Sequence, residues 1–173
     1  MIVAISGKSG CGNSTVTRMV ADELQLRRIN YTFKDMAAER GVNFEELHQQ
    51  ATADPEIDRY LDRQQVELAS SGNCVLGSRL AIWLLENADL RVYLDAPLEV
   101  RGERIALREG ISLAEAIAAT AERDAKDRRR YIVLYGLDID DSAQADLLVD
   151  AASNDQAQVA AIVVAAAKKA VGS

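Results

Sequence analysis

The sequence predicts an α/β domain built on a parallel sheet. Short apolar runs typical of buried strands alternate with longer amphipathic segments typical of helices along the whole chain. The composition agrees with this fold class, because aromatic residues make up only 5% of a chain rich in aliphatic residues and alanine. The length of 173 residues suits one core, and no repeat or low-complexity linker interrupts it. A single domain is therefore expected over residues 1–173.

The predicted elements of the N-terminal half have turn or capping residues at their ends. Asn43 and Glu46 form a capping-box pattern that starts one helix, and Asp54-Pro55 starts another that stops at Gly72. The predicted elements are a buried strand at residues 2–5, a helix at 14–26, a strand at 29–33, helices at 44–52 and 55–70, and a strand at 74–76.

The C-terminal half continues the alternation. Pro97 opens a helix that closes at Gly110, and Ser112 with Glu115 forms a second capping box at the start of a long helix. The predicted elements are a short apolar helix at residues 80–86, a strand at 90–94, a helix at 97–110, a long helix from 112 to about 131–135, a strand at 147–149 and a closing helix at 154–171.

A glycine-rich loop joins the first predicted strand to the first predicted helix. Gly7, Gly12 and Ser14 fit the pattern G-x-x-x-x-G-K-[ST] of a phosphate-binding loop at every fixed position except one, where Asn13 replaces lysine. The backbone N–H groups of such a loop bind phosphate oxygens. The residues expected around the phosphates are Gly7, Lys8, Ser9, Gly10, Cys11, Gly12, Asn13, Ser14 and Thr15.

Asn13 cannot supply the positive charge that the usual lysine places beside the β- and γ-phosphates. Lys8, one residue after the first glycine, is the candidate replacement, acting within the chain or across a dimer contact. The alternative interpretation is that Lys8 is a solvated loop lysine and that the phosphate site is weak. Cys11 is interpreted as a small residue that fits a tight loop, in preference to a redox role.

The overall composition argues against several classes of function and location. A net charge of −7 disfavours binding to nucleic-acid polymers and anionic membranes. Cys11 and Cys74 fall in a loop and a predicted buried strand, so a disulfide is not expected and a reducing cytoplasm is favoured. The chain begins with a core strand and has no apolar stretch near the ~20 residues that span a bilayer, so neither a signal peptide nor a membrane span is expected. His48 is the only histidine, which argues against histidine-rich metal sites and Ser-His-Asp triads.

Basic residues are concentrated within eight positions of the long predicted helix, at Arg123, Lys126, Arg128, Arg129 and Arg130. Arg123, Asp127 and Arg130 share one helical face. A solvated face with mixed charges would explain this pattern without any function. The functional interpretation is that the arginines clamp phosphates from a mobile segment while Asp127 orients them. In a net-acidic protein such a cluster favours a small anionic substrate.

Two further cations follow predicted strands. Arg79 comes just after the strand at 74–76, and Lys34 comes after the strand at 29–33. In open α/β sheets ligands bind outside the carboxyl ends of the strands, so both residues are candidate ligand contacts. An ordinary surface position is the alternative for each of them.

Six tracts in series carry a family resemblance. They are the glycine loop, residues 54–64, the turn at 78–81, residues 108–112, the arginine tract at 123–131 and residues 135–141. In this order, from residue 2 to about 150, they resemble the short form of cytidylate kinase. The resemblance implies the P-loop NTPase fold of nucleoside monophosphate kinases, with a five-stranded parallel sheet flanked by helices, a CMP-binding segment at about 33–68 and a lid at about 120–138. It also implies transfer of the γ-phosphoryl group from Mg-ATP to CMP or dCMP.

The resemblance also implies roles for individual residues. The loop from Gly7 to Thr15 would bind the ATP phosphates, with the Ser14 hydroxyl on Mg²⁺. The implied catalytic residues are Arg123, Asp127 and Arg130, to which the absence of the usual loop lysine adds Lys8. The implied CMP-binding residues are Lys34, Asp58, Arg63 and Arg79. The expected partners are ATP and CMP or dCMP only, in a cytoplasmic monomer or weak dimer.

Three departures from the family pattern leave alternatives open. They are Asn13 in the loop, Gly77-Ser78 where many members carry Glu-Gly, and the tract at 31–34, which lacks the usual Gly-Asp and arginine. A nucleotide-binding regulator without turnover is one alternative. A kinase for a different small acceptor is the other, because two of the departures lie on the acceptor side.

Overall fold

The computed structural model describes residues 1–172, apart from the side chains of His48 and Thr52. It confirms a five-stranded parallel sheet with the strand order β2-β3-β1-β4-β5. The strands are β1 (Ile2–Gly7), β2 (Arg27–Ile29), β3 (Cys74–Gly77), β4 (Leu90–Asp95) and β5 (Leu147–Asp150). The central strand β1 is buried along its whole length, as expected for a strand with helices on both faces.

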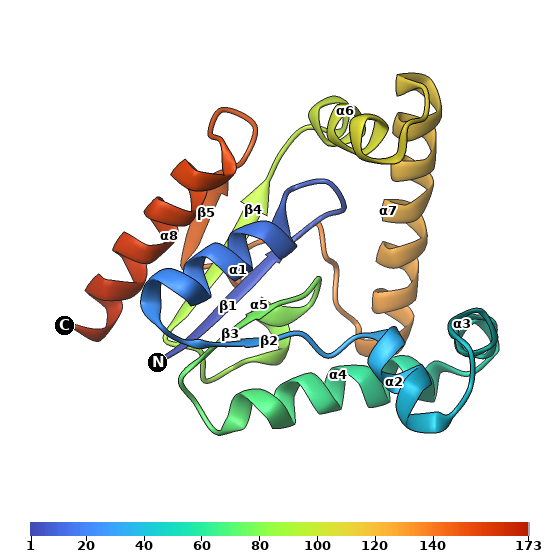
Figure 1. The fold of residues 1–173 in the computed structure, drawn as a ribbon, viewed down its shortest axis with the longest axis horizontal. Coiled ribbons are helices and arrows are strands. Elements are labelled where there is room, and N and C mark those ends of the chain that lie inside the picture. The colour runs from blue at the N-terminus through green and yellow to red at the C-terminus, as the bar shows by residue number, and fades with distance from the viewer. Residues whose placement is uncertain (173) are drawn as a thin grey trace.

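Helices cover both faces of this sheet (Figure 1). They are α1 (Asn13–Leu24), α2 (Phe33–Arg40), α3 (Phe44–Ala53), α4 (Pro55–Ser70), α5 (Ala81–Leu84), α6 (Leu98–Glu109), α7 (Leu113–Tyr135) and α8 (Gln156–Val171). Val3 and Ile5 of β1 pack in one core with α1 and α8, while Ile2 and Ala4 pack with α4 and α5 in another. Successive side chains of a strand point to opposite faces, so the apolar run of β1 supplies both cores.

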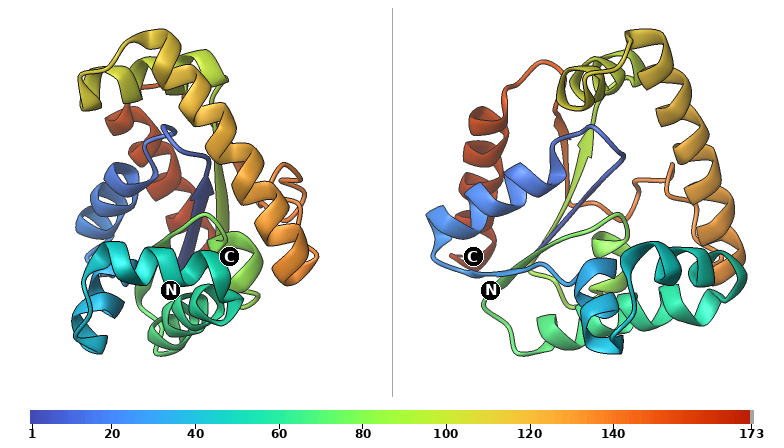
Figure 2. Two further views of the ribbon diagram at one scale, coloured as in Figure 1. Left: turned by 90° about the vertical axis from the view of Figure 1, so that its right-hand side faces the viewer. Right: turned by 45° about the vertical axis from the view of Figure 1, so that its right-hand side comes forward.

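Helices α2, α3 and α4 form a separate cluster beside one end of α7, as both views in Figure 2 show. Met36, Ala37, Leu47 and Ile57 are its buried centre. The long helix α7 runs from α6 to this cluster (Figure 1). The carboxyl ends of the strands therefore face a region bounded by α7 and by the α2–α4 cluster.

The strand predicted at residues 29–33 is wrong, because β2 ends at Ile29 and α2 begins at Phe33. A capping box starts α2: the Lys34 N–H donates to Thr32 Oγ1 at 3.2 Å, and the Thr32 N–H donates to Asp35 Oδ2 at 2.7 Å. Lys34 consequently lies in the first turn of a helix and does not follow a strand. Among residues 1–172, no helix is long and apolar enough to cross a membrane.

Candidate active site

The loop between β1 and α1 has the backbone of a phosphate-binding loop. Gly10 and Gly12 have φ angles of 87° and 88°, which L-residues rarely adopt. A Cβ atom on Gly10 would lie 2.8 Å from the Arg101 backbone oxygen, so position 10 has no space for a side chain. The loop lines a cavity of about 1210 Å³ at the N-terminus of α1, where unpaired N–H groups favour anions.

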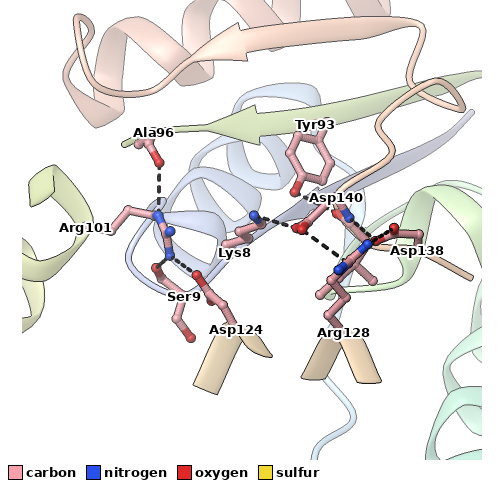
Figure 3. A network of polar contacts seen from close by, with 10 residues as sticks. Lys8, Ser9, Tyr93, Ala96, Arg101, Asp124, Arg128, Asp138 and Asp140 are labelled. Carbon is pink, nitrogen blue, oxygen red and sulfur yellow. Dashed lines mark hydrogen bonds and ion pairs between the residues drawn. The ribbon is translucent and has the colours of Figure 1, made fainter. Parts of the chain in front are cut away.

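Two arginines of α6 hold this loop from outside. Arg101 Nη1 donates to the Ser9 carbonyl at 3.1 Å, and Asp124 of α7 pairs with the same guanidinium at 2.8 Å (Figure 3). Arg104 donates to the carbonyls of Gly10 at 3.4 Å and Ala151 at 2.5 Å. Sequence reasoning missed both arginines, although their spacing of three on one predicted helix places them on the same face.

Asn13 is bound to the end of β3. Its amide donates to the Ser78 carbonyl at 3.4 Å, and its Oδ1 accepts from Thr17 Oγ1 at 3.1 Å. Thr17 also fills the space beside Gly77, so a Cβ atom at position 77 would clash with the Thr17 side chain. Asn13, Thr17 and Gly77 thus form one packed unit, so two departures from the family pattern have a common structural basis.

Lys8 lines the same cavity as the loop glycines. Its Nζ lies 2.6 Å from Oδ1 of Asp140, in the segment after α7. The side chain of Lys8 is 25% exposed. The charge of Lys8 is therefore at the edge of the loop cavity and is held by a carboxylate.

A second cavity, of about 1010 Å³, lies between α7 and the α2–α4 cluster. Its lining includes Asp58 of α4, Arg79 after β3, and Arg123, Asp127 and Arg130 of α7. Arg79 and Arg123 line both cavities. The structure thus brings five predicted site residues together and places two cations where the cavities meet.

Ion pairs connect most of these groups. Arg79 pairs with Asp127, and its Nη2 donates to Ser9 Oγ in the glycine loop at 2.5 Å. Arg130 lies 3.5 Å from Asp127 Oδ1 and 3.4 Å from Asp58 Oδ1. Burial lowers the pKa of Arg79, and the charges of Arg123 and Arg130 add to this effect, while Tyr131 and Asp124 oppose it. Within the described part of the chain, Arg123 has no hydrogen bond or ion pair.

The other predicted residues lie away from the two cavities. Lys34 and Arg63 are exposed, and Arg63 lies 3.6 Å from Glu56 of its own helix. Cys11 is 2% exposed within the core beside α1. Burial raises the pKa of its thiol, which agrees with the interpretation of Cys11 as a small loop residue.

A hydrogen bond joins α4 to the end of α7. Tyr135 Oη donates to Asp62 Oδ2 at 2.6 Å. Burial raises the pKa of Asp62 to about 6, Asp58 adds to this increase, and Tyr135 and Arg130 oppose it. The folded state therefore holds this proton more tightly than the unfolded chain does, so the contribution of Asp62 to stability is greatest below about pH 4 and decreases as pH rises to about 6.

Asp62→Asn is expected to remove this pH dependence. Its amide oxygen still accepts from Tyr135, so the free energy of unfolding should shift in favour of the variant by about 1–3 kcal/mol between pH 4 and pH 7.5, relative to wild type. Urea denaturation at the two pH values measures this difference. Glu103→Gln, an exposed change on α6, is the control, and equal pH profiles for wild type and Asp62→Asn would contradict the prediction.

Comparisons with known proteins agree with this geometry. A model of the cytidylate kinase-like family matches residues 2–153. The cytidylate kinase of Pyrococcus horikoshii is 43% identical over 168 residues, covering 96% of this chain and 88% of the relative. Cytidylate kinase 2 of Borreliella afzelii is 47% identical over 154 residues, covering 87% and 86%.

Solved structures agree on the fold. A shikimate kinase from Acinetobacter baumannii in complex with shikimate superposes with a TM-score of 0.62 at 15% identity, covering 99% of this chain and 93% of the other. An uncharacterized protein from Eubacterium ventriosum gives a TM-score of 0.70 at 15% identity, covering 97% and 98%. These similarities support the P-loop kinase fold, and the family match over most of the sequence shows that this chain belongs to the cytidylate kinase-like family.

Proposed function

We propose that this protein transfers the γ-phosphoryl group of ATP to CMP or dCMP, giving ADP and CDP or dCDP. The observation that carries the proposal is the pair of cavities that meet at Arg79 and Arg123. One cavity has a phosphate-binding loop, and the other has carboxylates and guanidinium groups suited to a small nucleotide. Phosphoryl transfer needs two phosphates in line and neutralised charge more than it needs covalent chemistry.

Each cation has a separate role in this proposal. Arg79 binds the acceptor phosphate, because it reaches from the second cavity to Ser9 of the loop. Arg123 and Arg130 bridge the donor and acceptor phosphates. Asp127 orients Arg79 and Arg130, with which it already pairs. Planar guanidinium groups suit the spread charge of the transferring phosphoryl group.

The acceptor nucleoside is assigned to the α2–α4 cluster. Asp58 is 4% exposed, lines the second cavity, and is the candidate contact to the cytosine edge or sugar. The proposed CMP-binding segment covers about 33–68 and the proposed lid about 120–138. Lys34 and Arg63 would contact CMP only when this segment closes over the second cavity.

The proposed Mg²⁺ enters with ATP. Ser14 lines the loop cavity, as does Ser78, whose buried hydroxyl has no hydrogen-bond partner in the described part of the chain. Among the side chains that the structure describes, no three from His, Cys, Asp and Glu are grouped so that they could hold a metal ion. This donor set fits a cation held mainly by phosphate oxygens, with the Ser14 hydroxyl as a protein ligand. When bound, the ion neutralises charge between the β- and γ-phosphates.

A nucleotide-binding regulator is the second candidate, because the amide of Asn13 is bound to Ser78 and Thr17 and carries no charge. A single-turnover assay with excess enzyme, limiting ATP and saturating CMP separates the two functions. A kinase produces CDP, whereas a regulator binds both nucleotides and produces none.

A panel of acceptors then tests the substrate class. CMP and dCMP are expected to react faster than UMP, AMP and shikimate, with ATP alone as the control for hydrolysis. Faster turnover of any other acceptor would replace CMP in the proposal and leave the phosphoryl transfer intact. A protein that makes no phosphorylated product from the whole panel is not a kinase of this class.

A further inference from the structure

Contacts with the core hold the segment that carries Asp140 in place. Tyr93 Oη of β4 donates to the Ile139 carbonyl at 3.0 Å. The Ile139 side chain is 4% exposed and packs with Leu80 and Tyr131. The backbone on the N-terminal side of Asp140 is thus held by both a hydrogen bond and buried packing.

The Asp140 carboxylate lies between two cations from different elements (Figure 3). Oδ1 is 2.6 Å from Lys8 Nζ, and Oδ2 is 3.3 Å from Arg128 Nε of α7. Arg128 is itself held by Asp138, with its Nε and Nη2 donating at 2.8 Å and 2.5 Å. Each oxygen of Asp140 therefore has its own partner, Lys8 of the glycine loop for Oδ1 and Arg128 of α7 for Oδ2.

A bond to a carboxylate restricts where the flexible side chain of Lys8 can lie. Position 13 lies in the first turn of α1, whereas Lys8 lies in the loop just after β1. A lysine side chain has a flexible four-carbon stem and loses entropy when it is ordered. Its ammonium group has three donors, so one bond to Asp140 leaves two N–H groups for phosphate oxygens.

We propose that Asp140 is a positioning residue that holds the Lys8 ammonium over the loop cavity, where Lys8 takes the place of the lysine absent from position 13. The inference rests on the proposed kinase function and says which residue positions the cation of the proposed ATP site. Asp140 does not line the loop cavity itself, so its effect on the nucleotide passes through Lys8. Sharing the carboxylate with Arg128 reduces its repulsion of the incoming phosphates.

The Lys8–Asp140 pair has little effect on folding. The two side chains are 25% and 45% exposed, and ion pairs this exposed contribute little to stability. Asp140→Asn should therefore keep Tm within about 3 °C of wild type. A loss of ATP binding without a loss of fold separates positioning from a structural role.

The test is Asp140→Asn in the full chain, with ATP and CMP affinities measured by calorimetry and rates by CDP formation. We expect about 10-fold weaker ATP binding and a decrease of about 10–30-fold in kcat/KM for ATP, with the affinity for CMP changed less than twofold. Asp138→Asn is the matched control, because Asp138 holds Arg128 at the same site while Lys8 pairs with Asp140. Its amide oxygen can also keep the bond that the Asp140 N–H donates at 3.0 Å.

The double variant Lys8→Ala/Asp140→Asn decides whether Asp140 acts through Lys8. In the Lys8→Ala background, Asp140→Asn should cause no further loss of ATP affinity. Equal losses in both backgrounds, or equal losses for Asp138→Asn and Asp140→Asn, would overturn the inference. ATP affinity is measured separately from CDP formation. A wild-type protein that forms no CDP would disprove the proposed function, and the ATP affinities of the variants would still decide the role of Asp140.

Discussion

Lys8→Ala is expected to lower kcat/KM for ATP by about 10²–10³-fold, the range found when one charge-stabilising donor of an active site is removed. Asn13 carries no charge and is bound to Ser78 and Thr17, so Lys8 is the lysine of the glycine loop that lines the loop cavity. Steady-state rates at varied ATP, with CMP saturating, measure the effect. Lys168→Ala, on the exposed surface of α8, is the control for loss of a lysine elsewhere.

A second variant tests whether the charge or the position of Lys8 matters. Asn13→Lys in the Lys8→Ala background returns a lysine to the usual place in the loop, and we expect it to recover at least about tenfold of the lost activity. Recovery would show that the two positions are alternatives for one role. Activity of Lys8→Ala within threefold of wild type would show that the donor phosphates are neutralised by other groups, with Arg104 and Arg123 the next candidates in the same cavity.

The parts of the fold that could be predicted from the sequence are those that depend on residues close together in the chain. The glycine loop, the capping box at Ser112 and the apolar run of β1 depend on neighbouring residues, and the structure has each of them in place. At Asn43 the side chain caps α3 by accepting from the Glu46 N–H at 2.7 Å, which is one of the two bonds of the predicted capping box. The segment at 29–33 failed because Tyr31 and Phe33 alternate like strand residues. In the structure they pack against the α2–α4 cluster, and the capping box at Thr32 starts a helix.

The same distinction applies to the candidate site. Arg79, Asp127 and Arg130 were predicted because strand ends and helical faces can be inferred from spacing alone. Arg101 and Asp140 were missed because their partners, Ser9 and Lys8, lie far away in sequence. Arg63 was assigned to CMP by family resemblance, and Lys34 also because it was expected to follow a strand. The packing of α2 and α4 leaves both exposed.

Arg130→Ala is expected to lower kcat by at least about 10²-fold, because it removes a charge contact that is proposed to form with the transferring phosphoryl group. Arg130 lies between Asp58 and Asp127 in the second cavity, so its removal also leaves these two carboxylates with one cation fewer. Rates at saturating ATP and CMP measure the effect on kcat. Arg28→Ala, on the exposed edge strand β2, is the control for loss of an arginine.

A double variant that removes a carboxylate together with Arg130 separates a role of Arg130 in phosphoryl transfer from a role in supporting the folded cavity. In Arg130→Ala/Asp58→Asn a neutral amide replaces the buried carboxylate of α4, so no unpaired charge is left and Tm should return toward the wild-type value. The value of kcat should stay low, because neither substitution returns a guanidinium group to the phosphates. If kcat recovers together with Tm, Arg130 supports the folded cavity and takes no part in the transfer, and the bridging charge must then come from Arg123, which lines both cavities.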